Sequence, residues 1–449
     1  MSDLRRSASG RSFRRRRALT TAAGIASAGA LAGFSLIGGG AANATTASDC
    51  TAANTVDAAG GGTETDIQNL LNAGGPDTIC LTGTFSVLNT LEFGRTVTIY
   101  GLSDAVLDAG STDHGVLLVT AASTLTLQNL RLTGGRAFQG GAVYADSLVV
   151  IDSEFDGNSS AYRGGAFLAG TADVSGSTFT GNSSGDYGGA IVVYGVLTLN
   201  SSTFDSNTSQ FQGGAVDVGS STVTNSTFID NSISDPAGNG GALLSGAGGS
   251  VTQSTFVGNT TPDPTGGEAI WVGGGSAFDL TLGGDLFVST AGTTQVAIDG
   301  ETTHDEGGNV FTTSQATENY FTGTDASTIF GQDGTALVGS GTLADNGGPT
   351  KTVALVTGSP AINAVPSTSA AASVTVDERG WNRVGLNDSG AYEFGAVDPD
   401  AVTAPPPAPT LAATGSDPGW LVALALVLLA AGTAIAARMT QSSRRTSRS

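Results

Sequence analysis

Acidic side chains are the residues of this 449-residue chain whose type and spacing come closest to catalysis. A glycoside hydrolase needs two carboxylates on one face, about 5 to 9.5 Å apart. The candidates by charge are Asp146, Asp152, Glu154, Asp173 and Asp217. No two of them hold a position that sets them apart from solvated turn residues. A lyase needs an arginine or lysine base and bound calcium. Apart from Arg95 near its start, the predicted repeat region offers only Arg131, Arg136 and Arg163 as bases.

The densest ionisable cluster is the run His304, Asp305 and Glu306. Consecutive residues do not converge as metal ligands do, so we interpret this run as a loop. Asn-x-Ser/Thr triplets at Asn158, Asn182, Asn207, Asn225 and Asn259 match glycosylation sequons, but they coincide with a structural repeat. We therefore expect no catalytic residue, no metal and no cofactor.

A repeat of 24 to 28 residues must position all these side chains. Its units open with Gly-Gly-Ala at residues 140, 164, 188, 213 and 240, and Gly266-Gly267 opens a degenerate sixth. Each unit then carries a phenylalanine and, three residues later, an asparagine. The phenylalanines are Phe155, Phe179, Phe204, Phe228 and Phe256, and the asparagines are Asn158, Asn182, Asn207, Asn231 and Asn259.

Strands of this length cannot bury a face alone, whereas wound coils pair equivalent strands in parallel about 4.8 Å apart. The repeat predicts an all-β fold, a single-stranded right-handed parallel β-helix of about ten coils over residues 77–330. Stacked asparagine amides would bond along the axis at a left-handed turn, and each Gly-Gly pair would form a sharp corner. A propeller blade needs more residues than the repeat provides.

Other positions complete this scheme. We expect residues 45–76 to cap the coils, with a short helix near residues 66–72. Cys50 and Cys80, the only cysteines, are expected to form a disulfide outside the cell, two buried thiols being the alternative. One mixed column is expected to face outward as a contact stripe. It contains Tyr144, Leu168, Val192, Asp217 and Leu244.

Residues 45–414 are strongly acidic. They keep all acidic side chains of the chain except Asp3 and Asp417, but only seven basic ones, so their net charge is about −30. Such a field repels nucleic acids and anionic polymers. The charge therefore argues against nucleic acid as a partner and against a lyase that acts on acidic polysaccharides.

Both ends of the chain carry targeting patterns. In residues 1–44, four arginines precede an apolar stretch and Ala42-Asn43-Ala44 supplies an A-x-A cleavage site, which predicts a signal peptide. An uncleaved signal anchor is the alternative, and twin-arginine and general secretory export both remain open. At the other end an apolar run over residues 420–437 can just span a bilayer. The arginines after it predict a cytoplasmic tail.

Residues 411–449 resemble the LPxTG-type sorting signal of Gram-positive surface proteins, in its LAxTG form. The motif is Leu411, Ala412, Ala413, Thr414 and Gly415, and the Pro-rich residues 397–410 before it are typical of a stiff spacer. The resemblance implies that a sortase thiol attacks the carbonyl of Thr414 and transfers the protein from the membrane to peptidoglycan. A simple membrane anchor is the alternative. We expect a location on the cell wall.

Two further resemblances concern the body. The GGA and F-x-x-N units resemble those of polymorphic outer membrane proteins and related β-helix surface proteins of the pectin-lyase-like superfamily. Residues 331–396, with Asp377-Glu378-Arg379-Gly380 and Asp388-Ser389-Gly390-Ala391-Tyr392-Glu393, resemble the choice-of-anchor Q domain. We interpret the charged residues of this segment as turn and ion-pair residues that complete the last coils.

These observations favour a non-enzymatic surface protein, an adhesin or surface-interaction protein that presents its β-helix to an extracellular ligand such as a glycan, a host surface or a neighbouring cell. The alternative is a surface-tethered polysaccharide lyase or glycoside hydrolase. A purely structural wall coat is a third possibility.

Overall fold

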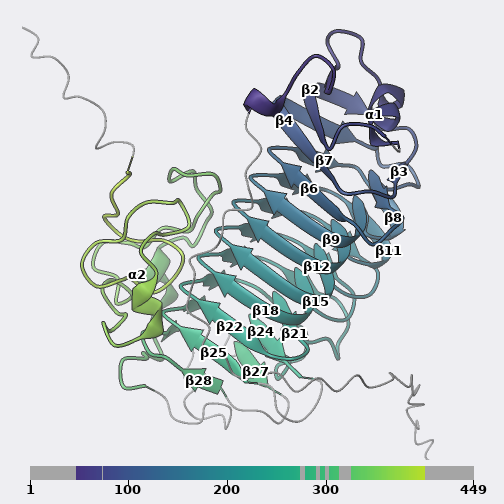
Figure 1. The fold of residues 1–449 in the computed structure, drawn as a ribbon. Helices are drawn as coiled ribbons and strands as arrows, with labels where there is room; N and C mark the ends of the chain where they lie inside the picture. Colours follow the sequence, from purple (N-terminus) through teal and green to yellow (C-terminus); the bar gives the residue numbers. More distant parts are fainter. Residues whose placement is uncertain are drawn as a thin grey trace, which may run out of the picture. The chain divides into compact units, whose positions relative to one another are not determined.

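The computed structural model describes residues 47–72, 74–273, 279–289, 294–298, 303–312 and 325–399. Its strands pair in parallel with the equivalent strands of the coils before and after them, as Phe155 does with Phe179. Figure 1 shows the strands as a stack of arrows that follow one another along the sequence. The chain forms a right-handed parallel β-helix of about ten coils, which confirms the predicted fold.

Most strands belong to one large sheet that follows the coils around two sides. The strands on its first side are β1 (Thr55–Asp57), β2 (Thr78–Ser86), β3 (Leu91–Phe93), β4 (Val97–Asp108), β5 (Leu117–Val119), β6 (Thr124–Gln128), β9 (Val143–Ile151), β12 (Phe167–Ser175), β15 (Ile191–Asn200), β18 (Val216–Thr224), β21 (Leu243–Ser245), β22 (Gly249–Thr252), β24 (Ile270–Val272), β25 (Leu280–Gly283), β27 (Val296–Ile298) and β28 (Thr303–Asp305).

The second side is formed by short strands with a buried phenylalanine, or with Leu132 in the first of them. They are β7 (Arg131–Thr133), β10 (Glu154–Asp156), β13 (Thr178–Thr180), β16 (Thr203–Asp205), β19 (Thr227–Ile229), β23 (Thr255–Val257), β26 (Leu286–Val288) and β29 (Val310–Phe311). A separate five-stranded sheet follows the asparagine turns. It contains β8 (Arg136–Gln139), β11 (Ser159–Arg163), β14 (Ser183–Ser184), β17 (Thr208–Ser209) and β20 (Ser232–Ile233).

The predicted phenylalanine column stacks inside the coils. Neighbouring rings of Phe155, Phe179, Phe204, Phe228 and Phe256 have centroids 4.7 to 5.0 Å apart and lie within 9° of parallel. The stack continues through Phe287 and Phe311 to Phe330. Because these rings are buried and aligned, the column gives the coils a continuous apolar interior.

The asparagine column is equally regular. The side-chain amide of each asparagine donates to the amide oxygen of the next, at 3.1 Å from Asn158 to Asn182 and 2.9 Å from Asn207 to Asn231. The sequence-based prediction was wrong in one detail, because the left-handed backbone belongs to the residue before each asparagine, as at Gly157 (φ 62) and Ser206 (φ 56). The asparagine itself turns inward and binds backbone groups of its neighbouring coils.

The Gly-Gly corners confirm the need for two glycines. Gly140 has a φ of 59, a backbone conformation that favours glycine. A Cβ on Gly141 would lie 2.0 Å from the carbonyl oxygen of Gly165 in the next coil. The first glycine therefore makes the turn and the second allows the coils to stack closely.

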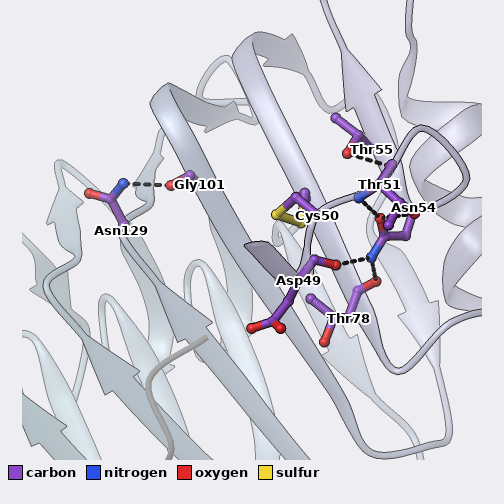
Figure 2. Close-up of a disulfide and its surroundings, with 9 residues drawn as sticks. Asp49, Cys50, Thr51, Asn54, Thr55, Thr78, Gly101 and Asn129 are labelled. Carbon is purple, nitrogen blue, oxygen red and sulfur yellow. Dashed lines mark hydrogen bonds between the residues drawn. A yellow bond between two sulfur atoms is a disulfide. The ribbon is translucent and has the colours of Figure 1, made fainter. Parts of the chain in front are cut away.

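The N-terminal end of the stack is covered. Helix α1 (Glu64–Leu71), expected near residues 66–72, buries Ile67 and Leu71 against the first coils. The predicted disulfide between Cys50 and Cys80 is present, beside the Asn54 side chain that binds the carbonyls of Asp49 and Thr78 (Figure 2). Strand β1 pairs with β2, so the sheet begins inside the segment interpreted as a cap.

The C-terminal segment, residues 331–396, contains the short helices α2 (Gly334–Val338) and η3 (Ala370–Ser373). Our expectation that it completes the last coils was wrong. Its apolar residues, among them Leu337 and Val353, pack instead on Ile229, Val257 and Val288, which point outward from β19, β23 and β26. The segment docks there because these three positions are apolar, whereas the equivalent position in β16 is Asp205.

Candidate functional site

An exposed group of aromatic side chains lies on the small sheet and its turns. Phe138 is 70% exposed and stacks on Tyr162 with ring centroids 5.6 Å apart. Tyr194 is 54% exposed and belongs to β15. Tyr187 pairs in parallel with Arg163 of the preceding coil. We call Phe138, Tyr162, Tyr187, Tyr194 and Arg163 the aromatic patch. The stacking of coils brings these residues together, although they span 57 positions of the sequence.

Arg163 holds the aromatic patch together. Its guanidinium carbon lies 4.6 Å from the ring centre of Tyr162, 4.8 Å from that of Tyr187 and 5.9 Å from that of Tyr194. These are cation–π distances. Two of its nitrogens also donate to the hydroxyl groups of Tyr194 and Tyr162, at 3.3 and 3.2 Å. The third nitrogen, Nε, is buried and has no hydrogen-bond partner among the described residues.

Two carboxyl groups stand beside Arg163. Asp186 lies 3.9 Å from its Nε, too far for a hydrogen bond, and burial raises the pKa of Asp186. Burial raises the pKa of Asp217 to about 7, although the charge of Arg163 acts in the opposite direction. Asp217 is half-buried, and the causes of its pKa shift are burial and the charges of Arg163 and Asp186.

Asp217 belongs to the mixed column that we expected to be exposed. The column does face away from the interior, and Tyr144 is exposed and Asp217 half-buried. The predicted exposure was wrong for Leu168, Val192 and Leu244, which are buried. The Gly-Gly corner covers them, since a Cβ on Gly188 would meet the side chain of Val192 at 2.6 Å. Asp217 is therefore a half-buried acidic residue at a position that its neighbouring coils fill with leucine or valine.

A groove of about 750 Å³ lies between the coils and the C-terminal segment. Asp152, Glu154 and Asp205 line it from the coils, and Asp345 and Lys351 line it from the segment. Neighbouring protein atoms desolvate Asp152 and raise its pKa. Glu154 forms an ion pair of 3.5 Å with Arg131, a further lining residue. Of the predicted acidic candidates, the structure brings Asp152 and Glu154 together, while Asp146 and Asp173 are exposed on other strands.

A buried polar contact joins the C-terminal segment to the coils. The carboxyl group of Glu378 binds the hydroxyls of Thr203, Thr227 and Thr350, and burial raises its pKa to about 8. Thr203 also donates to the carbonyl of Lys351 at 2.8 Å. A threonine hydroxyl has one proton, and Thr203 uses it toward the carbonyl of Lys351. The Thr203 oxygen can still accept a hydrogen bond, and the carboxyl group of Glu378 donates one when it is protonated.

Charged residues of the same segment form buried ion pairs, as the sequence indicated. Arg383 lies 3.1 Å from Glu393, and it also donates to the side chain of Asn225 on the coils. Arg379 pairs with Asp377 at 2.6 Å. Both arginines are held within the docked segment, so these residues serve its packing.

The remaining candidates have structural positions. Thr303–Asp305 is strand β28, so our interpretation of His304 and Asp305 as a loop was wrong. Asp305 accepts hydrogen bonds from Asn309 and Thr328, which explains its place at the end of the coils. The sequon asparagines named above are all buried. The cleavage site at Ala42 and Ala44 and the motif at 411–415 lie outside the described residues, as does the apolar run 420–437.

In the described ranges no group of His, Cys, Asp or Glu side chains could hold a metal ion. The same residues include no helix long and apolar enough to span a membrane. Comparison of the chain with protein-family models, with curated proteins and with solved structures gives no match. The fold defines the class of this protein as a parallel β-solenoid, compatible with a pectin-lyase-like β-helix.

Proposed function

We propose that this chain is an exported surface-interaction protein that is covalently attached to the cell wall and presents its β-helix to a ligand outside the cell. The observation that supports the proposal best is the docking of the C-terminal segment. A tether that begins at residue 397 would act on a segment held against the coils by Glu378, Arg383 and the apolar contacts of Leu337. A pull on the wall attachment would therefore reach the β-helix through a buried contact.

Attachment is tested by expressing the full chain in a Gram-positive host that has a sortase for this motif. We expect the wild-type chain to remain with peptidoglycan after extraction with hot detergent and to be released by a muralytic enzyme. Thr414→Ala keeps the backbone carbonyl but removes the threonine side chain that is part of the recognised motif, so this variant should be extracted by detergent. Thr410→Ala, one residue before the motif, is the matched control and should stay attached. Wall linkage of Thr414→Ala would contradict the proposal.

Interaction is tested with the same cells. Cells that display the wild-type chain should bind a glycan, a matrix protein or other cells more strongly than cells that lack the gene. Cells carrying Thr414→Ala should lose most of this binding, because the chain is no longer fixed to the wall. Equal binding by cells with and without the chain would overturn the proposed role.

One observation favours a second candidate, a surface-tethered glycoside hydrolase. The groove brings Asp152, whose pKa is raised, close to the ion-paired Glu154. A carboxyl group with a raised pKa near a second carboxyl group is the arrangement of a general acid and its partner. Incubation with neutral polysaccharides, followed by a reducing-end assay, tests this function. Product formed by the wild type and lost in Asp152→Asn would support it.

A further inference from the structure

The two most exposed aromatic side chains among the described residues, Phe138 and Tyr194, both belong to the aromatic patch. Five aromatic residues of the described ranges are exposed, and four of them lie between positions 138 and 211. They are Phe138, Tyr144, Tyr194 and Phe211, whereas Phe394 lies in the C-terminal segment. Exposed aromatic rings that gather in one place mark contact surfaces, because water solvates them poorly and a partner can cover them.

The aromatic patch is also rigid before anything binds. Arg163 contacts three tyrosine rings and donates to two of their hydroxyls. Phe138 stacks on Tyr162 with an angle of 16° between the ring planes. A surface that is already ordered loses little conformational entropy on binding. Arg163 occupies the space among the rings, which excludes a second cation as the ligand.

Polar groups at the same place have unused hydrogen-bonding capacity. Arg163 Nε has no hydrogen-bond partner in the described part of the chain. The half-buried Asp217 carboxyl group lies close enough to Arg163 to interact with its charge. The preceding and following coils have valine and leucine at the position of Asp217. An acidic residue in place of an apolar one breaks the local packing pattern, and such breaks are expected at functional sites.

A sugar ring matches both halves of this surface. Its C–H face is apolar and stacks on aromatic rings, while the hydroxyls at its edge need donors and acceptors. The net charge near −30 of residues 45–414 repels acidic polymers. Asp186 and Asp217 also stand beside the single cation of the aromatic patch. A neutral glycan therefore fits better than one that contains uronic acid or phosphate.

We infer that the aromatic patch is a binding site for neutral glycans, with Phe138 and Tyr194 as stacking platforms and Arg163 and Asp217 as hydrogen-bonding groups. This inference rests on the proposed function, for which it names the class of ligand. It places the site on the small sheet and on the neighbouring strand β15, which carries Tyr194. None of the residues of the aromatic patch lines the groove that contains Asp152.

The test uses the full chain in detergent micelles and calorimetric titration. The probes are neutral oligosaccharides of glucose, mannose, galactose and N-acetylglucosamine, with oligosaccharides of uronic acids as the charged comparison. We expect at least one neutral probe to bind and the uronic acid probes to bind more weakly. Failure of every neutral probe, or tighter binding of a uronic acid probe, would overturn the inference.

Variants locate the site. Phe138→Ala and Tyr194→Ala should each weaken binding about three- to tenfold, the range of an aromatic stacking contact. Asp217→Leu should weaken it about tenfold, and this variant should fold because Leu244 fills the equivalent position in the next coil. Phe394→Ala removes an exposed aromatic ring elsewhere and should leave affinity unchanged. Equal affinity of all four variants would contradict the assignment.

The two proposals fail in different ways. If displayed wild-type cells adhere and Phe138→Ala with Tyr194→Ala has no effect on adhesion or titration, the glycan site is wrong and the surface role stands. If the neutral probe binds the aromatic patch but the displayed chain confers no adhesion, the site stands and the surface role is wrong. A partner protein that binds the aromatic patch in place of every sugar would also overturn the glycan assignment.

Discussion

Glu378 and Thr203 lie 175 positions apart in the sequence, yet their side chains meet at 2.8 Å in a fully buried contact. The bond joins the C-terminal segment to strand β16 in the middle of the coil stack. Its strength depends on a proton, because burial without a cationic partner raises the pKa of Glu378 to about 8.

The chain is therefore expected to lose stability as the pH rises. Below the ordinary pKa of 4.5 both the folded and the unfolded chain hold the Glu378 proton. Between that value and about 8 only the folded chain holds it, which costs about 1.4 kcal/mol of stability for each pH unit. Above about 8 this dependence ends. Glu378→Gln should flatten the profile measured by urea unfolding, and Glu92→Gln, at an exposed position, should not. Parallel profiles for the two variants would contradict the assignment.

Asn207 should be among the least replaceable residues of the coils. Its amide binds the carbonyl of Phe179 and the side chain of Asn231, and it accepts from Asn182. Asn207→Ala leaves several buried polar groups without partners, so we expect a loss of about 3 kcal/mol or more in unfolding free energy. Asn200→Ala, at an exposed position, is the control and should change it by less than about 0.5 kcal/mol. Equal losses of unfolding free energy in the two variants would contradict a stabilising role of the asparagine column.

Phe204→Ala is expected to open a cavity in the interior stack. The ring lies between those of Phe179 and Phe228 at 4.7 and 4.8 Å and is fully buried. The expected loss is about 3 to 5 kcal/mol of unfolding free energy. Phe211→Ala removes an exposed ring from the same coil and serves as the control. A small loss for Phe204→Ala, equal to that of the control, would show that the ring does not support the stack.

The disulfide between Cys50 and Cys80 should stabilise the first coils in particular. Because each coil contacts mainly its neighbours, loss of a bond at one end acts locally. The variant with both cysteines replaced by alanine should lose roughly 3 kcal/mol of stability in that region. Hydrogen exchange should become faster in strands β1 and β2 and stay unchanged in β26. Faster exchange along the entire stack would contradict local action.

The coil architecture could be predicted from the sequence because each repeat carries the same residues at the same places. Phe155 and Phe179 signal the stack by identity alone, and the Gly-Gly pairs signal the corners. The lateral docking of the C-terminal segment could not be predicted in this way. The docking depends on Ile229 and Val257, which point outward because each follows an inward-pointing phenylalanine in its strand. It also depends on a partner segment that lies about a hundred residues further along the chain.

The aromatic patch was missed for a related reason. Its rings come from positions that do not repeat, so no column of the sequence marks them. Tyr162 and Asp186 lie in neighbouring coils but are residues of different type, so they form no recognisable column. Phe138 reaches Tyr162 only because β8 pairs with β11. One signal was available, because Asp217 is the only acidic residue in its column. We interpreted that column as an exposed contact stripe and gave Asp217 no role of its own.

Parallel pairing of Tyr187 with Gln212 has an evolutionary consequence. Residues 188–212 make one complete coil. It contains a Gly-Gly corner, three strands, and one member each of the phenylalanine and asparagine columns. In-frame duplication of that stretch would insert a new coil between two coils of the same pattern. The phenylalanine and asparagine columns would then continue through the inserted coil. Recombination between such repeats can therefore lengthen or shorten the stack of coils while the same interior columns continue through it.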